Sequence, residues 1–240
     1  MLGAWSIVNG SFTTVGAHLS AALAERLASY GKRVLLFELS PSCPTLDIFL
    51  GVSERVVYTL SDVRKIPARD VALKVRGNLY FVPIAVGETA NDVSCLEACA
   101  EALAPDVILL SAERSQILTA RRFSDGMLLL TDATHASLRS AAALALEHAF
   151  DGFVLADFVP NKQSILQMPP LTEICDTLGL PLFGILPRID QAKPHALQGK
   201  DFLFSVRNMA GRLLGEERPL LCGISVAGMR KRTFFTRTPE

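Results

Sequence analysis

The segment between the first apolar run and the first helical pattern contains the residue types that could hold a phosphate group. A glycine-containing loop that follows a strand and opens a helix can present backbone N–H groups to phosphate oxygens. Such loops normally add a lysine followed by Ser or Thr, and no lysine lies between Asn9 and His18. We therefore predict a vestigial phosphate loop and do not expect ordinary ATP hydrolysis. Its positions are Gly10, Ser11, Phe12, Thr13, Thr14, Val15, Gly16, Ala17 and His18.

The elements that position this loop are short and apolar. The chain has 240 residues, of which 50% are hydrophobic, and a mean hydropathy of +0.32, so it can bury a substantial core. Apolar runs such as Val34–Phe37 and Met127–Leu130 are far shorter than the ~18–20 residues that span a bilayer. Strands that are apolar on both faces are typical of a parallel sheet covered by helices.

Strand and helix patterns alternate along the chain. This order predicts an α/β fold with a doubly wound, mostly parallel sheet, helices on both faces, and a ligand site at the carboxyl ends of the strands. We expect one domain over residues 1–222 and a basic, aromatic tail over 223–240. The expected strands are Ala4–Val8, Arg33–Phe37, Leu79–Val82, Val107–Leu110, Met127–Thr131, Gly152–Ala156 and Leu182–Leu186. The expected helices are a first one from Val15 to a stop at Gly31, then Ala90–Leu103, Ala136–Phe150, Leu171–Leu178 and Phe202–Leu214.

Charge and cysteine content narrow the function classes. Lys plus Arg and Asp plus Glu number 24 each, for a net charge of +0, so no global field favours nucleic acid. Cys95 and Cys99 are spaced to share a helix face, but no His or Cys cluster completes a zinc site. We expect buried, reduced thiols and no metal. The start of the sequence lacks the basic region of a signal peptide, which favours a cytoplasmic location.

Several segments together resemble the MinD/ParA family of deviant-Walker P-loop ATPases, collinearly over nearly the whole chain. They are Gly31–Leu36, Thr45–Val52, Arg55–Val63, Leu79–Pro83, Leu178–Pro187 and Asn208–Glu217. The resemblance implies a P-loop NTPase-like fold in which ATP joins two subunits and dimerisation turns on membrane or DNA binding.

The functional positions of that family are altered here. Its loop carries a signature lysine, two glycines, a second lysine and a magnesium-ligating Thr, which fall on Ser11, Phe12, Thr13, Gly16 and Ala17. A one-residue shift keeps Val15 and Gly16, but places Phe12 and Ala17 at the lysine positions and His18 at the magnesium position. The paired acids after the second strand become Glu38 and Ser40, the Walker B aspartate becomes Ser111, and the purine-facing asparagine becomes Ala156.

The size of the lost interactions predicts a pseudo-ATPase. A charge-assisted hydrogen bond contributes ~1.5–3 kcal/mol, so losing two lysines and the magnesium anchor removes roughly 5–8 kcal/mol. Micromolar binding requires about 8 kcal/mol. We therefore expect no catalytic residue and no cofactor, ATP and magnesium being relevant only if this interpretation is wrong. The expected role is a constitutive scaffold or spatial-positioning regulator, with protein partners and a homodimer left open.

The end of the sequence is a candidate membrane contact. It resembles the family's C-terminal targeting helix and combines basic residues with an aromatic pair: Met229, Arg230, Lys231, Arg232, Phe234, Phe235 and Arg237. Basic side chains near an anionic leaflet contribute about 1 kcal/mol each. A solvated terminus is the alternative.

Two rival functions remain open. The first is a regulator that binds a nucleotide without hydrolysing it efficiently. The second is a ParA-like DNA-binding partition module, which the neutral net charge disfavours.

Overall fold

The computed structural model describes residues 3–10, 14–90, 92–158, 168–190, 196 and 198–220. Within these residues the strands form one eight-stranded sheet in the order β3-β4-β2-β5-β1-β6-β7-β8. All neighbouring pairs are parallel except β3 and β4, which are antiparallel at one edge. The strands are β1 Gly3–Asn9, β2 Val34–Leu39, β3 Leu73–Arg76, β4 Leu79–Val82, β5 Val107–Ala112, β6 Gly126–Asp132, β7 Gly152–Ala156 and β8 Leu182–Ile185.

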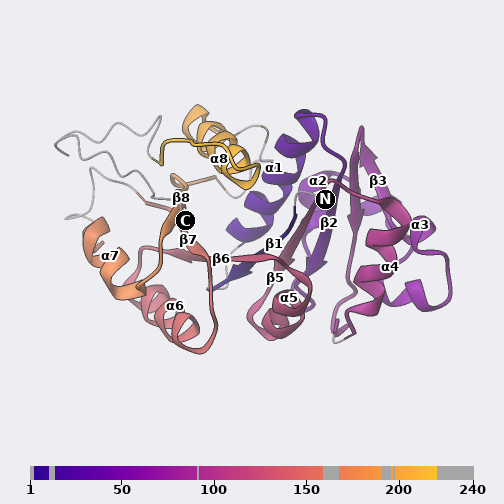
Figure 1. Ribbon diagram of the computed structural model, residues 1–240, viewed down its shortest axis with the longest axis horizontal. Coiled ribbons are helices and arrows are strands. Elements are labelled where there is room, and N and C mark those ends of the chain that lie inside the picture. The colour runs from indigo at the N-terminus through magenta and orange to yellow at the C-terminus, as the bar shows by residue number, and fades with distance from the viewer. Residues whose placement is uncertain are drawn as a thin grey trace.

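Helices cover both faces of the sheet (Figure 1). The first face carries α1 Val15–Ser29, α2 Leu46–Leu50 and α8 Lys200–Leu213, which share one apolar cluster with that side of the strands. The second face carries α3 Ala68–Val71, α4 Ser94–Leu103, α5 Ile117–Phe123, α6 His135–Glu147 and α7 Leu171–Leu178 around a second cluster. Short 3-10 helices lie at Ser53–Arg55, Leu60–Arg64 and Arg114–Gln116.

The strand order creates a crevice next to β1. Strand β1 lies between β5 and β6. From β1 the chain runs toward one edge of the sheet, to β2, and from β5 it runs toward the opposite edge, to β6. In doubly wound sheets, such a reversal leaves a crevice at the carboxyl ends of the strands. In this chain it opens above Asn9, Leu39 and Ala112, the last residues of β1, β2 and β5.

The structure confirms the predicted fold class and the seven predicted strands, most of which extend slightly further than predicted. Helix α4 is shorter than expected, because it begins at Ser94 and not at Ala90. The antiparallel strand β3 was not predicted. Cys95 and Cys99 are both buried, as expected.

In the part of the chain that the structure describes, no helix has the length and apolar content needed to span a membrane. The same residues contain no group of three or more His, Cys, Asp or Glu side chains placed to hold a metal ion.

Candidate functional site

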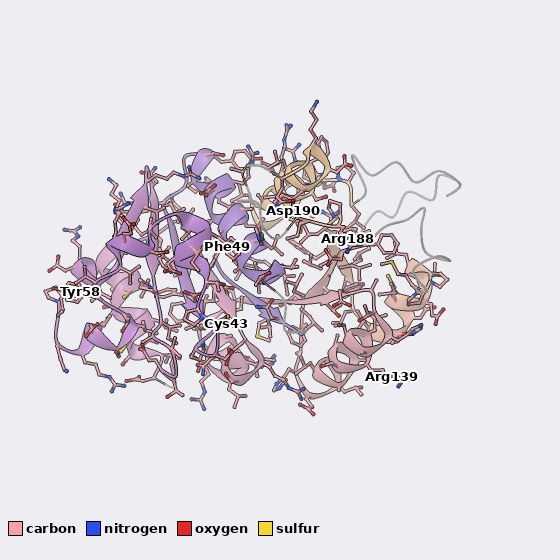
Figure 2. All side chains as sticks on the ribbon, turned by 180° about the vertical axis from the view of Figure 1, so that it is seen from behind. Cys43, Phe49, Tyr58, Arg139, Arg188 and Asp190 are labelled. Atoms are coloured by element: carbon pink, nitrogen blue, oxygen red, sulfur yellow. The ribbon has the colours of Figure 1, made fainter. Side chains whose placement is uncertain are left out.

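A cavity of about 250 Å³ lies at the carboxyl ends of β1, β2 and β5. Its described lining consists mainly of small and hydroxyl-bearing residues, with three charged side chains among them. Figure 2 labels one lining residue, Cys43, near the centre of the molecule. The described lining residues are Asn9, Gly10, Thr14, Ala17, Glu38, Ser40, Ser42, Cys43, Thr45, Ser111, Glu113, Arg114 and Ser140.

Glu38 is the buried charged residue of this cavity. It occupies β2, which is otherwise wholly apolar, and is only 2% exposed. Its Oε1 atom accepts hydrogen bonds from the backbone N–H groups of Thr45 (2.6 Å) and Leu46 (2.9 Å), at the start of α2. Its Oε2 atom is buried and has no hydrogen-bond partner among the described residues. The two oxygens of Glu38 therefore differ: one accepts two backbone hydrogen bonds, and the other is buried without a described partner.

Burial raises the pKa of Glu38 to about 7. Desolvation disfavours the charged carboxylate, and the negative charge of Asp47 acts in the same direction, whereas the two backbone hydrogen bonds act in the opposite direction. Near neutral pH the Glu38 side chain is therefore divided between its neutral and ionised forms.

A second carboxylate, Glu113, joins two loops at the rim. It accepts hydrogen bonds from the Ser42 backbone N–H (3.2 Å), from the Ser42 hydroxyl and from the Ser115 hydroxyl. Its neighbour Arg114 is largely exposed and lies 3.9 Å from Glu147 of α6. The positive charge of Arg114 is therefore close to a carboxylate outside the cavity.

The backbone before α1 is closely packed. The Gly10 N–H donates to the Leu130 carbonyl of β6 (2.8 Å), and the Gly10 carbonyl accepts from the Ser140 hydroxyl (3.3 Å). At Gly16, an added Cβ would lie 1.9 Å from Asn9 Oδ1. Gly16 therefore has no room for a side chain unless Asn9 moves. This packing favours the alignment that keeps Gly16 as a glycine and places Ala17 at the second lysine position.

A histidine at the start of a helix is more often a capping or surface residue than a phosphate contact, and the sequence favours that interpretation for His18, but the structure contradicts it. His18 is fully buried, and its ring centroid lies 3.9 Å from that of Phe49 on α2, with the two planes at 42°. The side chain lies on the face of α1 that packs against α2 and does not line the cavity. The cause of the error is tertiary, because α2 covers this turn of α1.

The remaining predicted site residues divide into three groups: those that line the cavity, those that are buried elsewhere, and those that lie outside the described residues. Ser40 and Ser111 line the cavity with Glu38, and Ser111 is the direct register partner of Glu38 across β2 and β5. Thr14 and Ala17 line it as well, whereas Val15 is buried in the core and Ala156 is the buried last residue of β7. The loop residues Ser11, Phe12 and Thr13, and the whole tail from Met229 to Arg237, lie outside the described residues.

Sequence reasoning missed a second polar group, at the carboxyl ends of β6, β7 and β8. Asp157 adopts a left-handed backbone conformation (φ 54°), and its Oδ1 atom is buried without a described partner. Burial raises the pKa of Asp157, a backbone hydrogen bond from Ile189 and the charge of Arg188 oppose this rise, and the charge of Asp132 adds to it. Figure 2 places Arg188 and Asp190 on the side of the molecule that carries α8. The available signal for this polar group in the sequence was the pair of charged residues Arg188 and Asp190, which follow β8.

Solved structures with this architecture include MinD and ParA proteins. MinD from Aquifex aeolicus superposes with a TM-score of 0.76 at 22% identity, covering 90% of this chain and 99% of that one. MinD from Pyrococcus horikoshii, solved with Mg-ADP, gives 0.61 at 22% identity, covering 77% and 80%. A ParA family ATPase from Chlorobium tepidum gives 0.62 at 15% identity, covering 90% and 94%. The fold is therefore that of the MinD/ParA P-loop NTPases.

Curated proteins that the chain is similar to include septum site-determining proteins. The septum site-determining protein MinD of Synechocystis is 26% identical over 238 residues, covering 87% of this chain and 86% of the relative. MinD of Escherichia coli K12 is 26% identical over 234 residues, covering 83% and 86%. No family model matches the chain. The chain is homologous to MinD.

Proposed function

We propose that this chain is a MinD-like protein without a working ATP site, which acts as a constitutive scaffold or spatial-positioning protein. Two relatives are named for determining the septum site, and a solved relative is described as part of a MinC:MinD cell division complex. Cell division and the placement of surface machinery are therefore the processes we consider, with a second protein as partner and a homodimer as a further assembly.

One observation carries this proposal: the charge of the cavity lining. The charged residues among the described lining are Glu38, Glu113 and Arg114, and the segment from Asn9 to His18 contains no lysine. A triphosphate needs several positive partners to offset its charge. Arg114 is the single cation in the described lining, and Glu147 lies 3.9 Å from it. These residues do not fit Mg-ATP.

The backbone and the metal position support the same conclusion. The Gly10 N–H, which could face a phosphate, already donates to Leu130. Ser111 takes the place of the family's metal-binding aspartate and contributes no negative charge. The loss of the family's two lysines and of its magnesium anchor removes roughly 5–8 kcal/mol, at ~1.5–3 kcal/mol for each charge-assisted hydrogen bond. Affinity for ATP is then expected in the millimolar range.

Calorimetry with Mg-ATP tests the proposal. We expect no saturable heat at micromolar ATP, and a dissociation constant below about 50 µM would overturn the proposal. Ala17→Lys is the matched variant, because Ala17 lines the cavity. A restored ammonium group at ~1.5–3 kcal/mol should tighten ATP binding by ten-fold or more. Equal binding by both proteins would show that the absent lysine is not the reason for weak binding.

A nucleotide-binding regulator is the second candidate, because a cavity is retained where the fold family holds its nucleotide. That function predicts a ligand retained on purification, or a melting temperature raised by a nucleotide. Tight binding with no phosphate release would favour the regulator over the scaffold.

A further inference from the structure

One wall of the cavity is the rim loop, residues 40–45, which joins β2 to α2. It contributes Ser40, Ser42, Cys43 and Thr45 to the described lining, and Figure 2 labels Cys43. The middle of the rim loop, at Ser42 and Cys43, is exposed. Because short exposed loops open more easily than the elements they connect, the contacts at the middle of the loop decide whether this wall keeps one position.

The two ends of the rim loop are held by contacts with neighbouring elements. Glu38 accepts hydrogen bonds from the backbone N–H groups at the start of α2. Closer to β2, the N–H of Gly87 donates to the carbonyl of the buried Pro41 (2.9 Å). Movement of the loop is therefore confined to residues 42–44, which lie between these two anchors.

The side chain of Glu113, the residue after β5, ties this middle part to the sheet. Its Oε2 atom accepts hydrogen bonds from the backbone N–H of Ser42 (3.2 Å) and from the Ser42 hydroxyl, and its Oε1 atom accepts from the Ser115 hydroxyl. The N–H of Glu113 donates to the Leu39 carbonyl (3.0 Å), which fixes its backbone at the end of β2. In the part of the chain that the structure describes, no lysine or arginine forms a salt bridge with Glu113.

We propose that Glu113 is a latch, whose carboxylate holds Ser42 and thereby keeps residues 42–44 in one position at the rim of the cavity. Hydrogen bonds to a carboxylate are stronger than those between neutral groups. Ser42 is exposed, so water competes with this contact and the latch can release. The hydrogen bond between Glu38 and Leu46 is buried. Release of the latch therefore moves residues 42–44 and leaves β2 and α2 in place.

The latch gives the proposed scaffold a fixed surface at the carboxyl ends of the strands. Because a side chain of the chain itself makes the tie, the rim loop keeps one position without the help of a bound ligand. A protein partner that contacts this rim then meets the same surface at all times. This consequence rests on the proposed function, since a nucleotide in the cavity would contact the same loop.

Exchange of backbone amides with water, followed by NMR on the ¹⁵N-labelled full chain without nucleotide, tests the latch. The diagnostic signal is the Cys43 amide, which donates to the Ser40 carbonyl (3.1 Å) and not to Glu113. In Glu113→Ala we expect this amide to exchange about ten-fold faster, because the charge-assisted hydrogen bond that orders the loop is lost. The Ser42 amide is not diagnostic, because the variant removes its acceptor directly.

Two further variants and one internal reference separate the latch from general effects. Glu113→Gln keeps an acceptor oxygen without the charge, and the Cys43 amide should exchange at an intermediate rate. Glu101→Ala removes an exposed carboxylate of α4 and should leave the rate unchanged. The Leu46 amide, which donates to Glu38, should exchange equally slowly in every variant, because α2 stays in place.

Two results would overturn the inference. An unchanged Cys43 rate in Glu113→Ala would mean that other contacts order the rim loop. Equal acceleration of the Cys43 and Leu46 amides would mean that Glu113 supports the fold as a whole. If Glu113→Ala does not fold, Glu113→Gln decides by the same two criteria. Tight ATP binding in calorimetry would instead refute the proposed function, and the two failures are distinguishable because exchange is measured without nucleotide.

Discussion

Glu38 is unusual because it is an ionisable side chain buried in an otherwise apolar strand. A buried acid with one unsatisfied oxygen is costly, and the N–H groups of Thr45 and Leu46 offset only part of this cost. The charged groups around it are Asp47 on α2 and the cavity residues Glu113 and Arg114. The burial of Glu38 therefore makes the stability of the fold depend on pH.

The sign of this dependence follows from the pKa. The pKa of Glu38 in the folded state is raised from 4.5 to about 7, so the folded state favours the neutral carboxyl group. The stability that this preference contributes is fully present below pH 4.5 and is lost as the pH rises through 7. The difference corresponds to about 3 kcal/mol in the free energy of unfolding. We expect Glu38→Gln to lose less stability than the unchanged chain between pH 5 and pH 8, measured by urea unfolding at both values.

The control for this experiment is Glu101→Gln, which should keep the pH dependence of the unchanged chain. Taking the difference between variants cancels the contributions of the other carboxyl groups. Identical pH dependence in the Glu38→Gln protein would refute the assignment of a raised pKa to this residue.

At the scale of elements, helix α8 is held to the sheet by close contact with β8. The Arg212 side chain donates to the Phe183 carbonyl (2.9 Å), and its guanidinium carbon lies 5.9 Å from the centre of the Phe183 ring. Gly184, the next residue of β8, leaves space for Met209: an added Cβ would lie 2.4 Å from the sulfur atom. The absence of a side chain at Gly184 therefore sets how closely α8 approaches the sheet.

Gly184→Ala should destabilise the protein by about 1–3 kcal/mol, because the added methyl group overpacks this contact. The measurement is the midpoint of urea unfolding. Gly199→Ala is the control for a methyl group added without overpacking, since an added Cβ there meets no atom within 4 Å. Because Gly199 is the N-cap residue of α8, where Gly is preferred to Ala, this variant should lose some stability, but less than Gly184→Ala. In a Met209→Ala background, Gly184→Ala should lower the free energy of unfolding by less than it does in the unchanged chain. An equal loss of stability in both backgrounds would show that contact with Met209 is not the cause.

At the scale of the whole molecule, two apolar clusters, one on each face of the sheet, enclose strands that are buried on both sides. The core on each face is therefore built from the apolar side chains of the strands and of the helices that cover them. Attachment to a membrane would depend on the tail, which lies outside the described residues.

The basic, aromatic tail predicts that the full chain binds to anionic membranes. Four basic residues near an anionic leaflet supply about 4 kcal/mol, and two partly inserted phenylalanines add ~2–3 kcal/mol. We expect the full chain to sediment with phosphatidylserine-rich liposomes, and to do so several-fold more than a chain lacking residues 229–240. Neutral phosphatidylcholine liposomes are the control. Equal sedimentation of both chains would discard the membrane role.

Much of the fold was predictable because its signals are local. Apolar runs of four or five residues, separated by helical stripes, predicted the strands. Gly31, whose φ is +80°, marked the end of α1. Strand β3 was missed because Lys74 and Arg76 alternate with its apolar residues, so this segment contains no apolar run. The Gly77-Asn78 pair between β3 and β4 was the available hairpin signal.

The sequence by itself determined the alternating α/β order and the absence of lysine from the loop, since both depend only on which residues follow one another. Only the tertiary structure decided that Glu38 and His18 are buried, that Glu113 binds Ser42 across 71 residues, and that Ser111 pairs with Glu38. The physical reason is that burial and long-range hydrogen bonds arise from elements packed against one another, and no local pattern records which elements those are.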